Sequence, residues 1–239
     1  MYQAFAEILP LKNSSVEELR IVFIYFTNKY HLIAYLRRFI RNFKKQVTIN
    51  KLISYFNNYL PLDEREKEEL ANRVIEKNIR RRQFILQEGD VCRHYSFVVS
   101  GCFRMYGVDA DGKEHNLQFA TENEWISDIG SFHSEKGSRL FIEAVEPSVI
   151  LQLEKSNLIY LYTHYLKFNR TFRVIIEDKF VELQNRVLQK ISSTAEERYL
   201  FFLEQYPQLS NRLPNNQIAS YLGITPEFLS KIRNNISQK

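Results

Sequence analysis

The chain has 239 residues, of which 44% are hydrophobic and 26% are charged, and this composition excludes disordered and fibrous proteins. Its formal charge is +5, and residues 1–45 hold the whole excess, with eight basic and three acidic side chains. The two cysteines, Cys92 and Cys102, are too few for an iron–sulfur cluster and lack the C-x-x-C spacing of a zinc ribbon. We therefore expect free thiols in a cytoplasmic protein, without a disulfide or a bound metal.

Residues 1–48 are predicted to form a helical extension. Lys29 and His31 interrupt its apolar run, residues 21–26, well before the roughly 18 residues that a membrane span requires. Acidic residues stand where a secretory leader would be basic, so neither a membrane span nor a leader is expected. A packed helix and a membrane-surface or partner-binding helix both fit the later part of this segment. Its hydrophobic side chains at helical intervals are Leu32, Leu36, Phe39 and Phe43.

The next segment, residues 49–76, is also predicted to be helical, and Pro61 divides it. An acid-rich helix is expected over residues 63–74. Asp63 precedes Glu66 by three positions, which is the spacing of an N-cap residue and its capping-box partner. This pattern indicates a helical segment that leads into the next domain.

From Ile79 onward the hydrophobic pattern changes from helical to strand-like. Short apolar runs are separated by turn sequences such as Glu88-Gly89-Asp90 and Ser100-Gly101. The pattern indicates an antiparallel β-roll of the jelly-roll, or double-stranded β-helix, type, in a domain that covers residues 49–166. The expected strands are residues 84–86, 95–99, 103–108, 115–119, 140–145 and 149–153.

A metalloenzyme of the cupin type is the catalytic alternative for such a roll. It would require two or three clustered histidines and a carboxylate. His94, His115 and His133 are available in the domain, but none of them forms an H-x-H pair. We therefore expect no catalytic residues and no enzymatic activity.

Residues 167–191 are predicted to form one long helix with two apolar stripes. Two stripes imply two packing partners, namely the roll of the same chain and the same helix of a second subunit. A parallel homodimer follows from this arrangement, whereas a single helix buried in one domain is the alternative. One stripe contains Phe172, Ile176, Phe180, Leu183, Val187 and Ile191, and the other contains Val174, Val181 and Leu188.

Residues 192–239 contain the pattern of a helix-turn-helix. Ala219 provides the small residue where two helices touch, and Gly223 provides a turn position that can adopt a positive φ. Thr225 is the expected cap of the second helix, Pro226 fits its first turn, and Glu227 lies near its positive end. The expected core positions are Ile218, Leu222, Ile224, Leu229 and Ile232.

This order of elements resembles the Crp/Fnr family of transcription regulators, from about Leu52 to the C-terminus. The resemblance implies an α+β fold: a helical extension (1–48), a β-roll sensor domain (49–166), a dimerisation helix (167–191) and a helix-turn-helix domain (192–239). Residues 1–45 lie outside the resemblance. Only a few residues follow the second helix of the motif, so the winged extension of many relatives is nearly absent.

In cyclic-nucleotide-binding relatives, a Gly-Glu pair at a short helix and a following arginine hold the ligand. The resemblance places Ser127 and Asp128 at the Gly-Glu position and Ser138, or Arg139 after a one-residue shift, at the arginine position. Asp128 would then bind a hydroxyl group and Arg139 a phosphate, whereas the alternative is that both are ordinary surface residues. A cyclic nucleotide is the leading single candidate for an otherwise unknown effector.

The helix geometry selects the side chains that would read DNA, because Leu229 and Ile232 face the core. Glu227 would accept a hydrogen bond from cytosine, and Lys231 would donate one to guanine or to a phosphate. Thr225 and Arg233 would contact the backbone. The full set of expected DNA-binding residues is Thr225, Pro226, Glu227, Ser230, Lys231 and Arg233.

We therefore expect an effector-sensing homodimer that binds an inverted repeat in double-stranded DNA with half-sites about one helical turn apart. The resemblance also implies a contact with RNA polymerase, and no membrane partner is expected. The alternative is a cyclic-nucleotide sensor or scaffold that uses its terminal helices for protein contacts and does not bind DNA.

Overall fold

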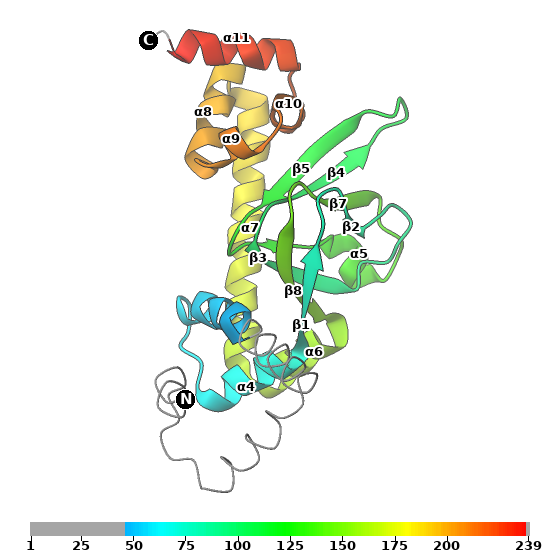
Figure 1. The fold of residues 1–239 in the computed structure, drawn as a ribbon, viewed down its shortest axis with the longest axis vertical. Coiled ribbons are helices and arrows are strands. Elements are labelled where there is room, and N and C mark those ends of the chain that lie inside the picture. Colours follow the sequence, from blue (N-terminus) through cyan, green and yellow to red (C-terminus); the bar gives the residue numbers. More distant parts are fainter. Residues whose placement is uncertain (1–45, 238–239) are drawn as a thin grey trace, which may run out of the picture. The chain divides into compact units, whose positions relative to one another are not determined.

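A computed structural model of the protein describes residues 46–237 (Figure 1). The chain divides into two compact units, residues 1–47 and 48–239, and the described residues make up nearly all of the second unit. The predicted helical extension over residues 1–48 lies almost entirely outside the described residues. Within the described part, no helix has the length and apolar character needed to cross a membrane.

The lead-in to the roll consists of helical residues 46–57 and helix α4 (Glu64–Arg73). The predicted capping box is confirmed: the Glu66 amide donates to the Asp63 carboxylate at 2.9 Å, and the Asp63 amide donates to the Glu66 carboxylate at 2.8 Å. The prediction of helix as far as residue 76 is wrong, because Val74 is extended and begins strand β1. Pairing along β8 outweighs the local helical pattern there.

The β-roll contains two four-stranded sheets with the strand orders β1-β8-β3-β6 and β2-β7-β4-β5, and all pairs are antiparallel. The six predicted strands are confirmed. Strands β1 and β6 were not predicted, because β1 follows α4 without a turn and β6 has two residues. The bounds are β1 (Val74–Ile79), β2 (Phe84–Leu86), β3 (His94–Ser100), β4 (Phe103–Val108), β5 (Glu114–Ala120), β6 (Trp125–Ile126), β7 (Leu140–Ala144) and β8 (Ser148–Glu154).

Alternation along β3 gives the two faces of its sheet different neighbours. Tyr95 and Phe97 point to the helical side, where their rings lie 6.1 Å from Phe172 and 5.1 Å from Tyr55, measured between centroids. Ser96 points to the opposite side and pairs in register with Gln152 of β8. The aromatic side therefore carries the main core, and the other face turns into the roll.

Helix α7 (Leu166–Ser192) confirms the predicted long helix. Its first part packs against the roll through the buried side chains of Phe168, Phe172 and Ile175. Farther along, its contacts with the roll are polar: Lys179 donates to Glu124 at 3.2 Å, and Arg186 donates to the Asn116 carbonyl at 3.1 Å. Of the apolar stripe that begins at Phe172, the later members Phe180, Leu183, Val187 and Ile191 are exposed and do not pack on the roll. The helix runs past the sheets of the roll (Figure 1), and these side chains are exposed within the described part of the chain.

The remaining helices, from α8 onward, share a core with the roll through Phe119 and Cys102. Phe119 of β5 lies 5.3 Å from Tyr221, between ring centroids. The Asn116 amide donates to the Ser220 hydroxyl at 3.0 Å, and that hydroxyl donates to the Glu114 carbonyl at 2.8 Å. The bounds of the helices not yet given are α5 (Ile129–Ser134), α6 (Lys155–His164), α8 (Ala195–Gln205), α9 (Leu209–Arg212), α10 (Asn215–Leu222) and α11 (Pro226–Ser237).

Candidate functional site

A glycine turn joins α10 to α11. Gly223 adopts φ +72°, which a side chain would strain, and the Ile224 amide donates to the Ala219 carbonyl at 3.0 Å. Ala219 is fully buried between the helices. The Thr225 hydroxyl accepts a hydrogen bond from the Phe228 amide at 3.2 Å, so Thr225 caps α11 as predicted.

One face of α11 is exposed within the described part of the chain. Leu229 and Ile232 are buried in the domain core, while Glu227, Ser230 and Lys231 are exposed on the opposite side. Hydrogen bonds from its own backbone amide and from Thr225 lower the pKa of the Glu227 carboxyl. Glu227 therefore stays ionised at neutral pH and can accept a hydrogen bond.

Arg233 lies at the edge of the buried side of α11. It donates to the Asn215 side chain at 2.6 Å and to the Ser210 carbonyl at 3.4 Å. Its guanidinium also lies 5.5 Å from the centroid of the Tyr199 ring. The structure therefore separates Arg233 from the exposed face and uses it to tie α11 to the preceding helices.

Phe228 was not singled out from the sequence, although 47% of it is exposed at the start of α11. Its signal is a large aromatic residue outside the apolar positions that Leu229 and Ile232 occupy. An exposed ring beside Glu227 can contact a thymine methyl group or a sugar. Phe228 therefore belongs to the exposed surface of α11.

Two of the four residues expected to hold a cyclic nucleotide, Asp128 and Ser138, are hydrogen-bonded to each other. The Asp128 carboxylate caps α5, accepting from the Ser131 amide at 3.1 Å, and also accepts from the Ser138 hydroxyl at 2.6 Å. The Ser127 hydroxyl is buried and donates to the His94 carbonyl at 3.2 Å. Arg139 is exposed and has no hydrogen bond or ion pair with the described residues.

The Asp128 carboxylate, at the position of the Gly-Glu pair of the relatives, already has partners in the protein. Each of its oxygens accepts one hydrogen bond, which leaves acceptor capacity on both. Of the four predicted residues, the structure brings together Asp128 and Ser138, and it leaves Arg139 on the surface.

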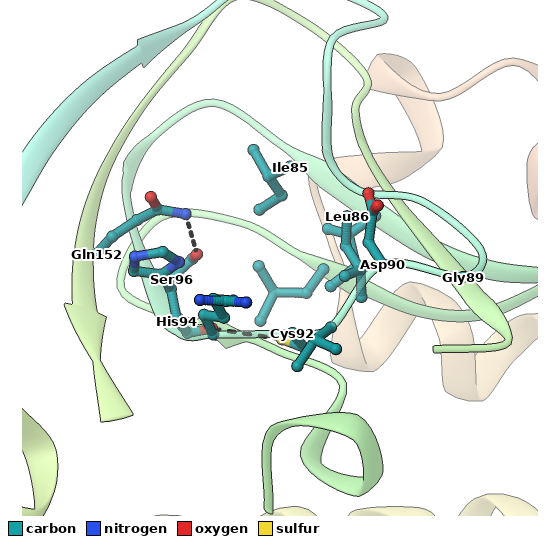
Figure 2. Close-up of a pocket in the computed structure, with 12 residues that line it drawn as sticks. Ile85, Leu86, Gly89, Asp90, Cys92, His94, Ser96 and Gln152 are labelled. Atoms are coloured by element: carbon teal, nitrogen blue, oxygen red, sulfur yellow. Dashed lines mark hydrogen bonds between the residues drawn. The ribbon is translucent and has the colours of Figure 1, made fainter. Parts of the chain in front are cut away.

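A cavity of about 380 Å³ lies beside these residues (Figure 2). Strands from both sheets line it, through Leu86 of β2, Ser96 of β3, Ile142 of β7 and Gln152 of β8. It therefore lies between the sheets, inside the roll. None of the four predicted ligand-binding residues lines it.

The polar groups of the cavity are neutral where they are buried. The Gln152 amide donates to the Ser96 hydroxyl at 3.0 Å, as Figure 2 shows, and both residues are buried. Burial, followed by the charge of Lys77, lowers the pKa of His94. His94 is therefore a neutral imidazole at pH 7. A polar residue within an apolar strand, such as Gln152 in the run 149–153, is the sequence signal for this site.

The comparisons with known proteins agree with this architecture. Residues 76–165 match the model of the cyclic nucleotide-binding domain. A search of curated proteins found no match. Solved structures share the fold, among them FixK2 from Bradyrhizobium japonicum, with a TM-score of 0.62 and 20% identity over 69% of this chain and 85% of that chain.

Two further solved structures match similar fractions of this chain and of their own chains. The regulator CLP from Xanthomonas campestris, described as responsive to c-di-GMP, has a TM-score of 0.60 and 12% identity over 74% of this chain and 92% of its own. A putative regulator of the Crp/Fnr family from Eubacterium rectale has a TM-score of 0.57 and 17% identity over 75% and 88%. The predicted resemblance to the Crp/Fnr family is therefore confirmed in the fold and in a cyclic nucleotide-binding domain at residues 76–165.

Proposed function

We propose that the protein is a cytoplasmic, homodimeric transcription regulator that binds DNA through α11 and senses an effector in its β-roll. The observation that carries this proposal is the exposed face of α11 behind a glycine turn. Glu227, Ser230 and Lys231 lie there on a helix whose opposite side is buried. A second helix held in this way is the element that other helix-turn-helix proteins place in the major groove.

Neighbouring side chains on the exposed face of α11 make different contacts with DNA in this proposal. Glu227 accepts from a cytosine amino group, and Lys231 donates to guanine or to a phosphate. Thr225 and Pro226 at the start of the helix lie closest to the bases and the backbone. Arg233 holds α11 against the preceding helices through hydrogen bonds to the Asn215 side chain and the Ser210 carbonyl.

The exposed part of α7 supports a parallel homodimer. Large apolar side chains gathered on one surface mark a protein interface, and pairs spaced seven apart suit two parallel helices. Phe180 with Val187 and Val181 with Leu188 have this spacing. In the part of α7 after Ile175, the apolar side chains that are at least half exposed are Phe180, Val181, Leu183, Val187, Leu188 and Ile191.

Replacing Val181 by glutamate tests the dimer. Two like charges in an apolar seam should weaken association by at least about 100-fold, while the roll stays folded. Light scattering over a concentration series measures the effect. Val108→Glu, at another exposed valine, is the matched control and should leave the dimer intact. A Val181→Glu dimer of unchanged affinity would show that this stripe does not face the partner.

The roll cavity supports an effector-sensing role. It lies inside a domain that matches the cyclic nucleotide-binding model, and its volume falls within the range of about 300–1,000 Å³ for small-molecule sites. Contact with RNA polymerase follows from the family resemblance and belongs to the same proposal.

A mobility-shift titration against genomic fragments tests DNA binding directly. We expect selected fragments to bind and the affinity to fall steeply between about 50 and 200 mM salt, because phosphate contacts release counterions. Lys231→Ala should weaken the complex, whereas Lys113→Ala, at an exposed lysine in the β4–β5 turn, should not. A protein that forms no salt-sensitive, sequence-selective complex would be a scaffold and not a DNA-binding regulator.

A further inference from the structure

The C-terminal helices carry few free cations for the phosphates of DNA. Residues 192–237 contain Arg198, Arg212, Lys231 and Arg233. The three arginines donate hydrogen bonds within the protein, to a carbonyl, to a carboxylate and to an amide side chain. Lys231 alone is exposed and without a hydrogen bond or ion pair among the described residues. Because affinity for DNA depends on the number of phosphates that a protein contacts, we expect other cations of the chain to take part.

Three consecutive arginines stand in the turn between β1 and β2. Arg80, Arg81 and Arg82 are all exposed, and none of their side chains has a hydrogen bond or ion pair with a described residue. The carboxylates of Glu143 and Glu146, near the end of β7, have arginine partners of their own. The positive charge of the turn is therefore not neutralised within the described part of the chain.

Hydrogen bonds fix the backbone of this turn. The Gln83 amide donates to the Arg80 carbonyl at 3.0 Å, and the Arg80 amide donates to the Gln83 side chain at 2.9 Å. The Arg82 amide donates to the Ala144 carbonyl at 2.7 Å. A turn that is held in this way presents its side chains at defined positions, so less order has to be gained when a partner binds.

The turn lies at the end of the roll that meets the C-terminal helices. Ala144, which it contacts, is followed by Val145, and this side chain packs against the core that the roll shares with α8 and α10. The next residue, Glu146, pairs with Arg212 of α9. One short segment therefore contacts both the arginine turn and the helices that lead to α11.

We propose that Arg80, Arg81 and Arg82 bind the phosphates of the DNA that flanks the site read by α11. A guanidinium group forms bidentate hydrogen bonds with phosphate and stays charged at neutral pH. Since the turn belongs to the roll and not to α11, its contacts reach phosphates outside the half-site and carry no base preference. The inference rests on the DNA-binding role proposed above and adds a second contact surface to it.

Mobility shifts of the full chain with two DNA fragments test this surface. One fragment holds only the selected inverted repeat, about 22 base pairs, and the other extends it by about one helical turn on each side. We expect the unmodified protein to bind the longer fragment at least about 10-fold more tightly, and with a steeper salt dependence, because additional phosphate contacts release more counterions.

A triple variant connects this gain to the turn. Arg80→Gln/Arg81→Gln/Arg82→Gln removes three charges from exposed positions and keeps side chains of similar length. It should bind the two fragments within about 2-fold of each other and should keep the affinity of the unmodified protein for the short fragment within about 3-fold. The single variant Arg81→Gln should lose part of the gain, and it keeps the test valid if the triple variant unfolds.

The matched control removes three charges from exposed positions elsewhere on the described surface. Arg65, Lys136 and Arg170 lie in α4, after α5 and at the start of α7. Their joint replacement by glutamine should leave the gain from the flanks intact. Equal losses in the control and in the arginine variant would show an effect of net charge and not of the turn.

The outcomes separate this inference from the proposed function. If the unmodified protein binds the short fragment selectively but gains nothing from the flanks, the inference is wrong and the regulator role stands. A gain that persists in the arginine variants would likewise overturn the inference and point to an acidic protein as the partner of the turn. If neither fragment is bound selectively, the proposed function itself fails, and this inference fails with it.

Discussion

Helices α5 and α11 both begin with a side chain that caps the first turn, but they differ in what they leave for a partner. At α5, the Asp128 carboxylate accepts from the Ser131 amide and from the Ser138 hydroxyl, which is buried. At α11, Thr225 caps the helix, while Glu227 and Lys231 remain exposed. Side chains of the protein itself bond to the carboxylate at the start of α5, whereas the charged side chains near the start of α11 are exposed.

The difference shows that a helix start at a family ligand position is not by itself a ligand site. What decides is whether the polar groups already have partners. The side chains at the start of α5 have them, so these residues stabilise the roll. On α11, by contrast, the charged side chains of Glu227 and Lys231 are exposed, so this face is where binding is expected.

Replacing Asp128 by alanine should have the largest effect on stability. The loss of an N-cap and of the acceptor for Ser138 should lower the free energy of unfolding by about 1–2 kcal/mol. Lys231→Ala, on the exposed face of α11, should change it by less than about 0.5 kcal/mol. Urea unfolding measures the free energy of unfolding of both variants. Equal decreases would show that the side chain at the start of α5 contributes no more to stability than the one on the exposed face of α11.

Arg233→Ala should lower the free energy of unfolding by about 1 kcal/mol, somewhat less than Asp128→Ala. The side chain is only partly buried, and its hydrogen bonds to Asn215 and Ser210 tie α11 to the earlier helices. Thermal unfolding of the variant without DNA checks this value. If stability is unchanged and only the salt dependence of DNA binding falls, Arg233 contacts the phosphates as the sequence analysis expected.

His94 should give the smallest effect, as a dependence of stability on pH. Burial, followed by the charge of Lys77, lowers its pKa below 6.5, so between the folded and unfolded pKa values the unfolded chain binds more protons. Stability should therefore decrease as the pH falls through 6.5 toward the folded pKa. His94→Gln should lose less stability than the unmodified protein between about pH 7.5 and 5.5 in urea unfolding. Identical pH profiles would contradict the lowered pKa.

Local patterns predicted much of the fold. The capping box at Asp63 and Glu66 and the turn at Gly223 depend on residues a few positions apart, so sequence spacing reveals them. The six alternating strands were predictable for the same reason. Strand β1 was missed because its pairing with β8 is a long-range interaction that outweighs the helical pattern.

The binding sites were less predictable, since they depend on which side chains meet in space. The exposed face of α11 followed from Leu229 and Ile232 in the core. The cavity did not, because Ser96 and Gln152 lie far apart in the sequence and meet only through the pairing of β3 with β8. The resemblance to the family placed Asp128 at a helix start, and the structure has it there as the N-cap of α5. The resemblance did not reveal that the Ser138 hydroxyl donates a hydrogen bond to the Asp128 carboxylate.

The measurement that tests the central claim most directly is a binding-site selection from random DNA with the unmodified protein and Glu227→Ala. The account predicts an inverted repeat with half-sites about one helical turn apart. In Glu227→Ala, the preference should relax at matching positions in both halves, by about 1–3 kcal/mol per base. Identical motifs from the two proteins would show that this face of α11 does not read bases, and the absence of any motif would contradict DNA-sequence recognition itself.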